Sequence, residues 1–197
     1  MVANMRFATV LAGVAAENMV RGGAWLFLDL GRRVERGQSV LAEIEVLLKV
    51  PPARVEPGLK LILELCDSVI TYRSRYLAVV QPAPVLDLVL ADPSNPRGLA
   101  FQLAAIQTAL TEVAGDAEDS LAEEAATLTR QADALVHDVL GAHDQPAAAA
   151  ALPPRLAAMA ETLRALSDAM TRRYFALLPP ARALGLDEAT EPADVLP

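Results

Sequence analysis

Charged side chains that could bind or process a carboxylate or a phosphate are concentrated between residues 17 and 36. Asp29 and Arg33 are four residues apart, as are Arg32 and Arg36, so each pair would share one face of a helix. In a pocket, arginines could hold an anion through paired hydrogen bonds, and Glu17 could act as a general base. The alternative is an ordinary solvated surface, on which each ion pair would stabilise by only about 0.3–0.5 kcal/mol. The candidate site residues of this first cluster are Glu17, Arg21, Arg32, Arg33, Glu35 and Arg36.

A second polar cluster occupies residues 67–76. Asp67, Thr71 and Arg75 are four residues apart and would line one face of a helix. Tyrosine hydroxyls nearby would need hydrogen-bond partners if they were buried. The cluster could bind a ligand, or it could be a buried polar network that ties helices together. Its candidate residues are Asp67, Thr71, Tyr72, Arg73, Arg75 and Tyr76.

A third cluster surrounds the segment 92–96, which is dense in turn-forming residues. Asn95 and Arg97 are its candidate ligand-binding residues, and Asp87, Asp92 and Gln102 accompany them. The alternative is a turn-and-cap assembly, in which Asn95 caps a helix that starts at the following proline.

The elements that must position these residues are helices. Apolar residues recur at helical spacing along most of the chain, and Gly22–Gly23 and several prolines interrupt the pattern. Gly31 lies inside one such helix at a cost of about 1 kcal/mol relative to alanine, which suggests close approach of a neighbouring helix or ligand. The predicted fold is all-α, an up-and-down bundle of about six helices. The predicted helices are 7–21, 24–50, 57–80, 96–113, 118–140 and 154–178, with a short helical segment at 85–90, an Ala/Pro linker at 142–154 and a loose tail at 179–197.

Composition excludes several classes of function. The net charge of −8 over 197 residues argues against nucleic-acid binding, which needs a basic face. The longest uncharged run, 98–111, is too short to span a membrane. Cys66 is the only cysteine, and two histidines make a poor metal site, so we expect no disulfide, metal or cofactor. Arg6 and the apolar run after it bear only a limited likeness to a signal peptide, so a cytoplasmic protein is expected.

Four ordered blocks of residues resemble the alpha-E domain family of bacterial all-helical domains, over about residues 5–178. The chain departs from the family pattern at Ala24 and Leu26, where glycine and arginine are usual, and at Gly37, where alanine is usual. The missing arginine at position 26 weakens the expectation of anion binding at that edge. The blocks are Glu17-Asn18-Met19-x-Arg21 with Trp25-x-Phe27-Leu28-Asp29-Leu30-Gly31-Arg32-Arg33-x-Glu35-Arg36, then 67–76, 85–103 and 166–175.

The resemblance implies a partner more clearly than it implies a reaction. Alpha-E domains are fused to, or encoded beside, circularly permuted ATP-grasp enzymes, which join a carboxylate to an amine through an acyl phosphate. The chain would then be a helical accessory module of a peptide-modifying or amide-forming system. The alternative is a catalytic or ligand-binding domain with a Glu/Arg/Tyr pocket for a peptide or carboxylate substrate. In that case Glu17, Arg32, Asp67 and Arg73 should face one cavity, whereas in the first case they need not.

The resemblance also implies that residues 1–178 lack an earlier helical half that family members carry. We therefore expect the chain to associate, either as a homo-oligomer or with such a half supplied by another chain. The apolar first helix, residues 7–19, would be the contact surface, unless it is buried in a closed monomeric bundle. Within the domain, Trp25, Phe27 and Leu28 are expected in the core. The charged residues Arg32, Glu35 and Arg36 are expected to reach partners on neighbouring helices.

Overall fold

The computed structural model describes residues 2–51, 54–76, 79–115 and 120–175, and every regular element within these ranges is a helix. The prediction of an all-α fold is confirmed. Nine α-helices and one π-helical segment occur in the described ranges, more than the predicted six because several are short. No described helix is long and apolar enough to cross a membrane. The predicted tail, 179–197, lies outside the described residues.

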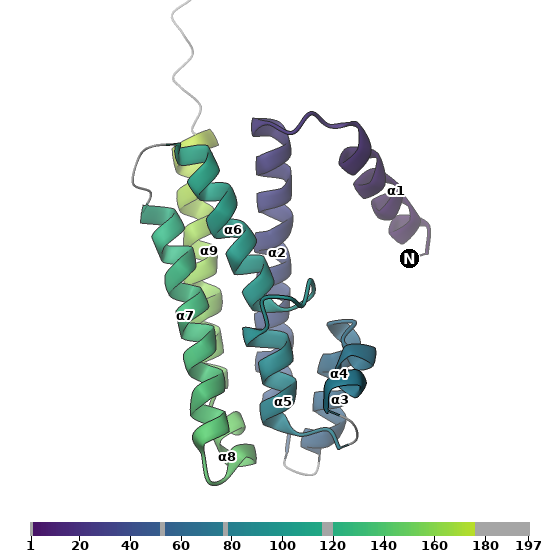
Figure 1. Ribbon diagram of the computed structural model, residues 1–197, viewed down its shortest axis with the longest axis vertical. Coiled ribbons are helices and arrows are strands. Elements are labelled where there is room, and N and C mark those ends of the chain that lie inside the picture. The colour runs from purple at the N-terminus through teal and green to yellow at the C-terminus, as the bar shows by residue number, and fades with distance from the viewer. Residues whose placement is uncertain (1, 52–53, 77–78, 116–119, 176–197) are drawn as a thin grey trace, which may run out of the picture.

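The bundle is built around α2 (Gly23–Leu48), which packs against both α6 (Leu99–Ala114) and α9 (Pro153–Phe175). α7 (Ser120–Gly141) packs against α6 and α9 and completes the four-helix body (Figure 1). Buried residues recur every three or four positions along α2, as in Val34, Leu41, Ile44 and Leu48. This spacing places them on one stripe of α2. Burial of that stripe against the neighbouring helices stabilises α2. The opposite face of α2 is free to carry charged residues.

The predicted helix 57–80 is wrong, because the structure divides it into α3 (Val55–Leu65) and α4 (Val69–Tyr76). Asp67 has a φ of 47°, in the left-handed region. The Asp67 N–H donates to the carbonyl of Glu64 at 3.0 Å, and the Ser68 N–H donates to the carbonyl of Leu63 at 2.7 Å. This pair of bonds is the Schellman motif that ends a helix. The apolar stripe predicted along one continuous helix is broken as well, and Leu61 and Leu65 are exposed.

A short helix, a π-helical turn and a loop connect α4 to α6. They are α5 (Pro82–Leu86), η2 (Asp87–Ala91) and the loop 92–98. The prediction that Asn95 caps a helix starting at residue 96 is wrong, because α6 starts at Leu99 with Gly98 as its N-cap. The Asn95 side chain instead accepts a hydrogen bond from the Arg97 N–H at 3.1 Å within a turn.

Two further expectations are corrected along the chain. The predicted linker 142–154 contains α8 (Gln145–Ala150), whose N-cap Asp144 accepts a hydrogen bond from the Ala147 N–H at 3.0 Å. Gly31 has open space where a side chain would project, so no helix approaches it. The close approach occurs instead at the buried Gly37, where an added Cβ would lie 2.9 Å from Leu163 Cδ2.

The N-terminal end of α2 is less buried than predicted. Leu28 is 40% exposed, and Trp25 is only partly buried. Phe27 is also partly buried and packs against Tyr174 and Phe175 of α9, with ring centroids 5.3 and 4.8 Å away. These three residues lie in the first two turns of α2, where Phe27 meets the last turn of α9 at the edge of the core.

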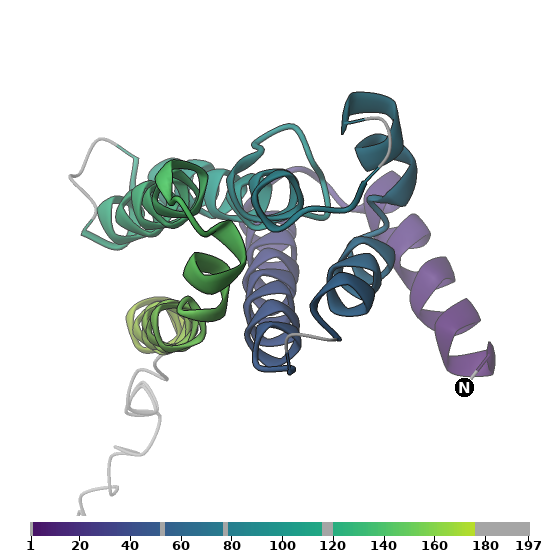
Figure 2. The same cartoon turned by 90° about the horizontal axis from the view of Figure 1, so that it is seen from below.

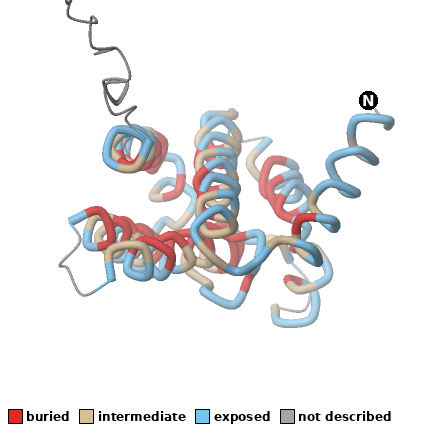
Figure 3. Tube along the Cα trace, turned by 90° about the horizontal axis from the view of Figure 1, so that it is seen from above, coloured by how far each residue is buried: buried red, intermediate tan, exposed pale blue. Residues whose placement is uncertain are grey.

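The first helix, α1 (Val2–Asn18), stands apart from the bundle (Figures 1 and 2). It makes only sparse contact with the other helices. In Figure 3 its trace is drawn almost wholly as exposed, whereas the buried residues of the other helices face one another. The alternative in which this helix is buried in a closed bundle is therefore wrong for the single chain.

Candidate anion-binding site

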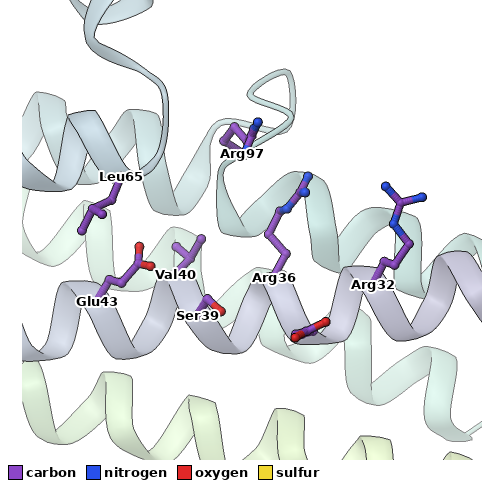
Figure 4. A pocket seen from close by; sticks show the side chains of 8 residues that line it. Arg32, Arg36, Ser39, Val40, Glu43, Leu65 and Arg97 are labelled. Atoms are coloured by element: carbon purple, nitrogen blue, oxygen red, sulfur yellow. The ribbon is translucent and has the colours of Figure 1, made fainter. Parts of the chain in front are cut away.

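The charged face of α2 forms one wall of an open pocket of about 290 Å³. Arg32, Arg36 and Glu43 follow one another at intervals of four and seven residues, so they project from one side of the helix. Arg97, on the loop 92–98, closes the pocket opposite Arg36, and Leu65 at the end of α3 borders it (Figure 4). The remaining lining residues are Glu35, Ser39 and Val40.

Three arginines of this pocket lack a carboxylate partner. Within the described residues, Arg32, Arg36 and Arg97 form no ion pair, and no hydrogen bond involves their guanidinium groups. Burial, together with the positive charges of Arg97, Arg33 and Arg32, lowers the pKa of Arg36. The guanidinium groups therefore repel one another, and an anion bound between them would relieve this repulsion. The prediction that Arg32, Glu35 and Arg36 reach partners on neighbouring helices is wrong, since no hydrogen bond or ion pair of their side chains occurs within the described residues.

Glu43 places an acidic side chain at the other end of the pocket. Its side chain lies below Leu65, at the end of the pocket far from Arg32 (Figure 4). Partial burial raises the pKa of Glu43, because desolvation disfavours the carboxylate. Burial also raises the pKa of Cys66, at the end of α3, to about 12, so this thiol is protonated and unreactive at neutral pH.

A second hollow of about 200 Å³ continues along the same face of α2, and Arg32 and Arg36 border both spaces. Here Arg33 is already paired. Its Nε donates to Asp29 Oδ2 at 3.1 Å, and its Nη1 donates to Gln102 Oε1 at 3.3 Å. Arg21 lies over the ring of Trp25, with its guanidinium carbon 3.8 Å from the ring centroid. Arg33 and Arg21 therefore support the local structure, and Arg32 and Arg36 remain the open donors.

Buried hydrogen bonds hold the loop that carries Arg97. Asn95 is 7% exposed, and its Nδ2 donates to Ser68 Oγ at 3.0 Å and to the carbonyl of Leu88 at 2.9 Å. Gln102 Nε2 donates to the carbonyl of Pro96 at 2.8 Å. These bonds fix the loop to the α3–α4 junction, to η2 and to α6. Arg97 is thereby held opposite α2 by groups outside the pocket.

The second cluster lies behind this loop and supports it. Arg75 pairs with Asp92 and donates to Ser94 Oγ at 3.1 Å, while Tyr76 donates to Asp87 Oδ2 at 2.8 Å. Tyr72 is buried, and its hydroxyl donates to the carbonyl of Val79 at 3.0 Å. This geometry matches the polar-network alternative for Tyr72, Arg75 and Tyr76. Arg75 acts on the α2 pocket only through the position of the loop.

The four residues expected to share a cavity do not meet. Arg32 lines the α2 pocket, whereas Arg73 lines a separate pocket of about 300 Å³ with Lys60, Glu64 and Tyr72. Asp67 is an exposed residue of the α3–α4 junction. Glu17 is exposed at the end of α1 and lines neither arginine pocket. Thr71, half-buried on α4, also lies outside the α2 pocket.

The α2 pocket contains adjacent glutamate and arginine residues, and a motif of these two residues appears in the description of a known protein family. That family, Alpha-E, is described as a predicted alpha-helical domain with a conserved ER motif, and its profile matches residues 3–175. The chain belongs to the Alpha-E family. Glu35–Arg36 is the only Glu-Arg dipeptide in the sequence, and both residues line the pocket. The one dipeptide of this sequence that fits the name of the motif therefore lies in the pocket.

Relatives of this Alpha-E chain are much longer proteins. The uncharacterized proteins Rv2567 of Mycobacterium tuberculosis and Mb2597 of Mycobacterium bovis are each 31% identical to it over 173 residues. The matched region covers 85% of this chain and 19% of each relative, so the chain spans about a fifth of their length. No solved structure matches the chain significantly.

Sequence reasoning missed two polar residues of the Alpha-E pocket, Ser39 and Glu43. A signal was available, because Glu43 is eleven residues after Arg32, close to three helical turns, and so lies on the same face. No group of three or more metal-ligating side chains occurs in the described part of the chain. The pocket can hold an anion at its arginine end, and Glu43 can accept a hydrogen bond from an amine or amide at the other end.

Proposed function

We propose that this Alpha-E chain is a helical binding module whose α2 pocket holds the carboxylate of a peptide or small carboxylic acid. One observation carries the proposal: Arg32, Arg36 and Arg97, without carboxylate partners, border one pocket in a chain of net charge −8. The whole chain has twenty-five acidic residues, yet none of those in its described part pairs with these three guanidinium groups. The pocket is thus prepared for an anion from outside.

The chemistry of the pocket favours a carboxylate that belongs to a peptide. Arginine presents paired N–H donors that match the two oxygens of a carboxylate, and such charge-assisted bonds are the stronger hydrogen bonds in proteins. Glu43 lies at the opposite end, where it can accept a bond from a backbone amide or an amine. A peptide carries a C-terminal carboxylate and, further along its chain, backbone amides that can reach the Glu43 end. Inorganic phosphate offers the anion alone and would leave the Glu43 end unused.

We further propose that the module serves an amide-bond-forming system built on a circularly permuted ATP-grasp enzyme. This partner rests on the family resemblance, since ATP-grasp enzymes activate carboxylates of the kind the pocket would hold. The length of the relatives supports a modular role, because the matched region is 19% of those proteins. The module would present the carboxylate substrate to the enzyme. In the alternative, the domain would itself catalyse a step, with Glu43 better placed than Glu17 to exchange a proton.

The binding claim is tested by calorimetric titration of a short acidic peptide with a free C-terminus against the same peptide with an amidated C-terminus. We expect the free acid to bind more tightly, and Arg36→Met and Arg97→Met to lose about tenfold in affinity each. Arg130→Met is the matched control, because Arg130 is a surface arginine already paired with Glu123. Equal affinity for the two peptides, or equal loss in the control, would overturn the proposal.

The role in amide-bond formation is tested by incubating the chain with a circularly permuted ATP-grasp protein, ATP and candidate peptides, followed by mass spectrometry. A product that requires both proteins and ATP, and that declines with Arg36→Met, supports an accessory module. A product formed by the chain alone indicates the catalytic alternative. If Arg36→Met leaves the product yield unchanged, the pocket has no part in the reaction.

A further inference from the structure

α1 presents its large side chains to solvent and its small ones to the rest of the molecule. Phe7, Val10, Leu11 and Val14 are 69, 64, 56 and 52% exposed. Their spacing of three, one and three residues places them on one stripe of the helix. Ala15, on another face, is buried. A stripe of this kind on a soluble domain marks a contact surface, because each of these side chains gains by leaving water.

We propose that the occupant of this stripe is α1 of a second copy, packed antiparallel about a two-fold axis near Leu11. The charges beside the stripe carry the choice. Arg6 and Glu17 are exposed and form no ion pair in the described structure. They are eleven residues apart, close to three helical turns, so both flank the stripe on the same side.

Antiparallel pairing satisfies these charges, and parallel pairing does not. When two copies of a helix pack antiparallel about the midpoint between Leu11 and Ala12, residues equally far before and after this midpoint face one another. Arg6 then faces Glu17 of the second copy, and the two-fold axis repeats the ion pair at the other end. The apolar residues between them pack together across the axis. In a parallel pair, the two-fold axis runs along the helices and places Arg6 and Glu17 of the second copy on the opposite side of the interface. Neither charge then meets its partner, so parallel pairing leaves both unpaired.

The arrangement is independent of the anion pocket, since α1 contributes no lining residue to it. It also accounts for the apolar stripe that α1 leaves uncovered in the single chain. The same pairing gives Glu17 a place as a partner of Arg6 in the second copy, in keeping with its distance from the arginine cluster.

Sedimentation velocity over a range of concentrations tests the proposal by charge exchange. The wild-type chain should dimerise. Arg6→Glu places two glutamates opposite one another at each end, and Glu17→Arg places two arginines there, so each variant should raise the dimer Kd about tenfold or more. An equimolar mixture of the two variants should restore the dimer, because every facing pair is again of opposite charge. Circular dichroism should show unchanged helicity, since these residues lie outside the core.

Cysteine cross-linking fixes the orientation. Leu11→Cys lies near the proposed axis and should form an intermolecular disulfide on oxidation, whereas Phe7→Cys lies about 6 Å along the helix from the axis and should not. The native Cys66 is 2% exposed and should not interfere. The proposal is overturned by a wild-type monomer at all concentrations, by a dimer that ignores both charge variants, or by equal cross-linking through Phe7→Cys.

Discussion

Arginines in this chain differ in whether a carboxylate lies within reach, and this difference separates structural side chains from ligand-binding ones. Arg33 and Arg75 each bond a carboxylate and a neighbouring polar side chain. Arg36 has no such partner, and burial and nearby guanidinium groups lower its pKa. An uncompensated charge beside like charges costs folding free energy, and proteins accept this cost at functional sites.

Replacing Arg36 with methionine should therefore separate stability from binding. The substitution keeps the length and apolar stem of the side chain and removes a repelled charge. We expect the free energy of unfolding to be unchanged or slightly higher, while affinity for the free-acid peptide falls about tenfold. Urea denaturation and calorimetry measure the two quantities. A clear loss of stability would show that Arg36 holds the fold together instead.

Asn95 should behave in the opposite way, because its role is to position Arg97. It is buried and bonds Ser68, the carbonyl of Leu88 and the Arg97 N–H. Asn95→Ala leaves those groups unsatisfied and should destabilise by about 2 kcal/mol, with a loss of peptide affinity as well. If affinity is unchanged in the folded variant, the loop does not present Arg97 to the ligand.

Glu43 allows a test by pH. Burial raises its pKa above the ordinary value of 4.5, so the folded state binds a proton more readily than the unfolded state. Ionisation of Glu43 then costs stability as pH rises through and above 4.5. Glu43→Gln removes this cost. The variant should equal or exceed the wild type in free energy of unfolding at pH 7, and the difference should shrink as pH falls toward 4. If Glu43→Gln were less stable than the wild type at pH 7, the Glu43 carboxylate would stabilise the fold.

Among the elements, α2 both carries the site and forms the centre of the bundle, and its two interior glycines show how the two faces differ. Gly31→Ala enters open space on the exposed face and should stabilise by about 1 kcal/mol through helix propensity. Gly37→Ala gains the same propensity but places a methyl group against Leu163. In thermal unfolding, the melting temperature of Gly31→Ala should be higher than that of Gly37→Ala. If Gly37→Ala melted at the higher temperature, the contact between Leu163 and α2 at residue 37 would not be crowded.

Sequence periodicity predicted the long helices well, because each buries a continuous apolar stripe that the spacing reveals. It failed where local hydrogen bonds decide the path of the chain. The break at Asp67 has no glycine or proline to mark it and depends on Asp67 adopting a left-handed conformation. Likewise, α8 was not predicted, because its sequence is an alanine-rich stretch that resembles a linker. Both errors concern short elements whose ends depend on a few backbone bonds.

For the site, the sequence identified the arginines but not their arrangement. Arg32 and Arg36 share a helical face by spacing alone, so their proximity was predictable. The approach of Arg97 was not, because it depends on bonds between Asn95 and residues up to 27 positions away in the chain. The sequence placed Glu17 close to these arginines. In the structure α1 stands apart from the bundle, so Glu17 lies outside the pocket. Long-range contacts of this kind leave no local pattern.

At the scale of the whole molecule, the chain consists of a packed bundle and a helix that scarcely touches it. Removing residues 2–18 should leave the melting temperature of the bundle within about 2 °C of the full chain at concentrations below dimerisation, because little apolar contact is lost. Differential scanning calorimetry measures this. A large fall in melting temperature would show that α1 belongs to the cooperative unit.

The central claim is that Arg32, Arg36 and Arg97 together bind a peptide carboxylate, and the guanidinium N–H signals report on it most directly. Nuclear magnetic resonance of a ¹⁵N-labelled chain during titration with the free-acid peptide follows the Nε–H signal of every arginine that can be observed. We expect saturable shifts at these three residues with one common Kd, and none at the paired surface residues Arg130 and Arg164. Shifts spread equally over all the arginines, or none at Arg36 and Arg97, would contradict it.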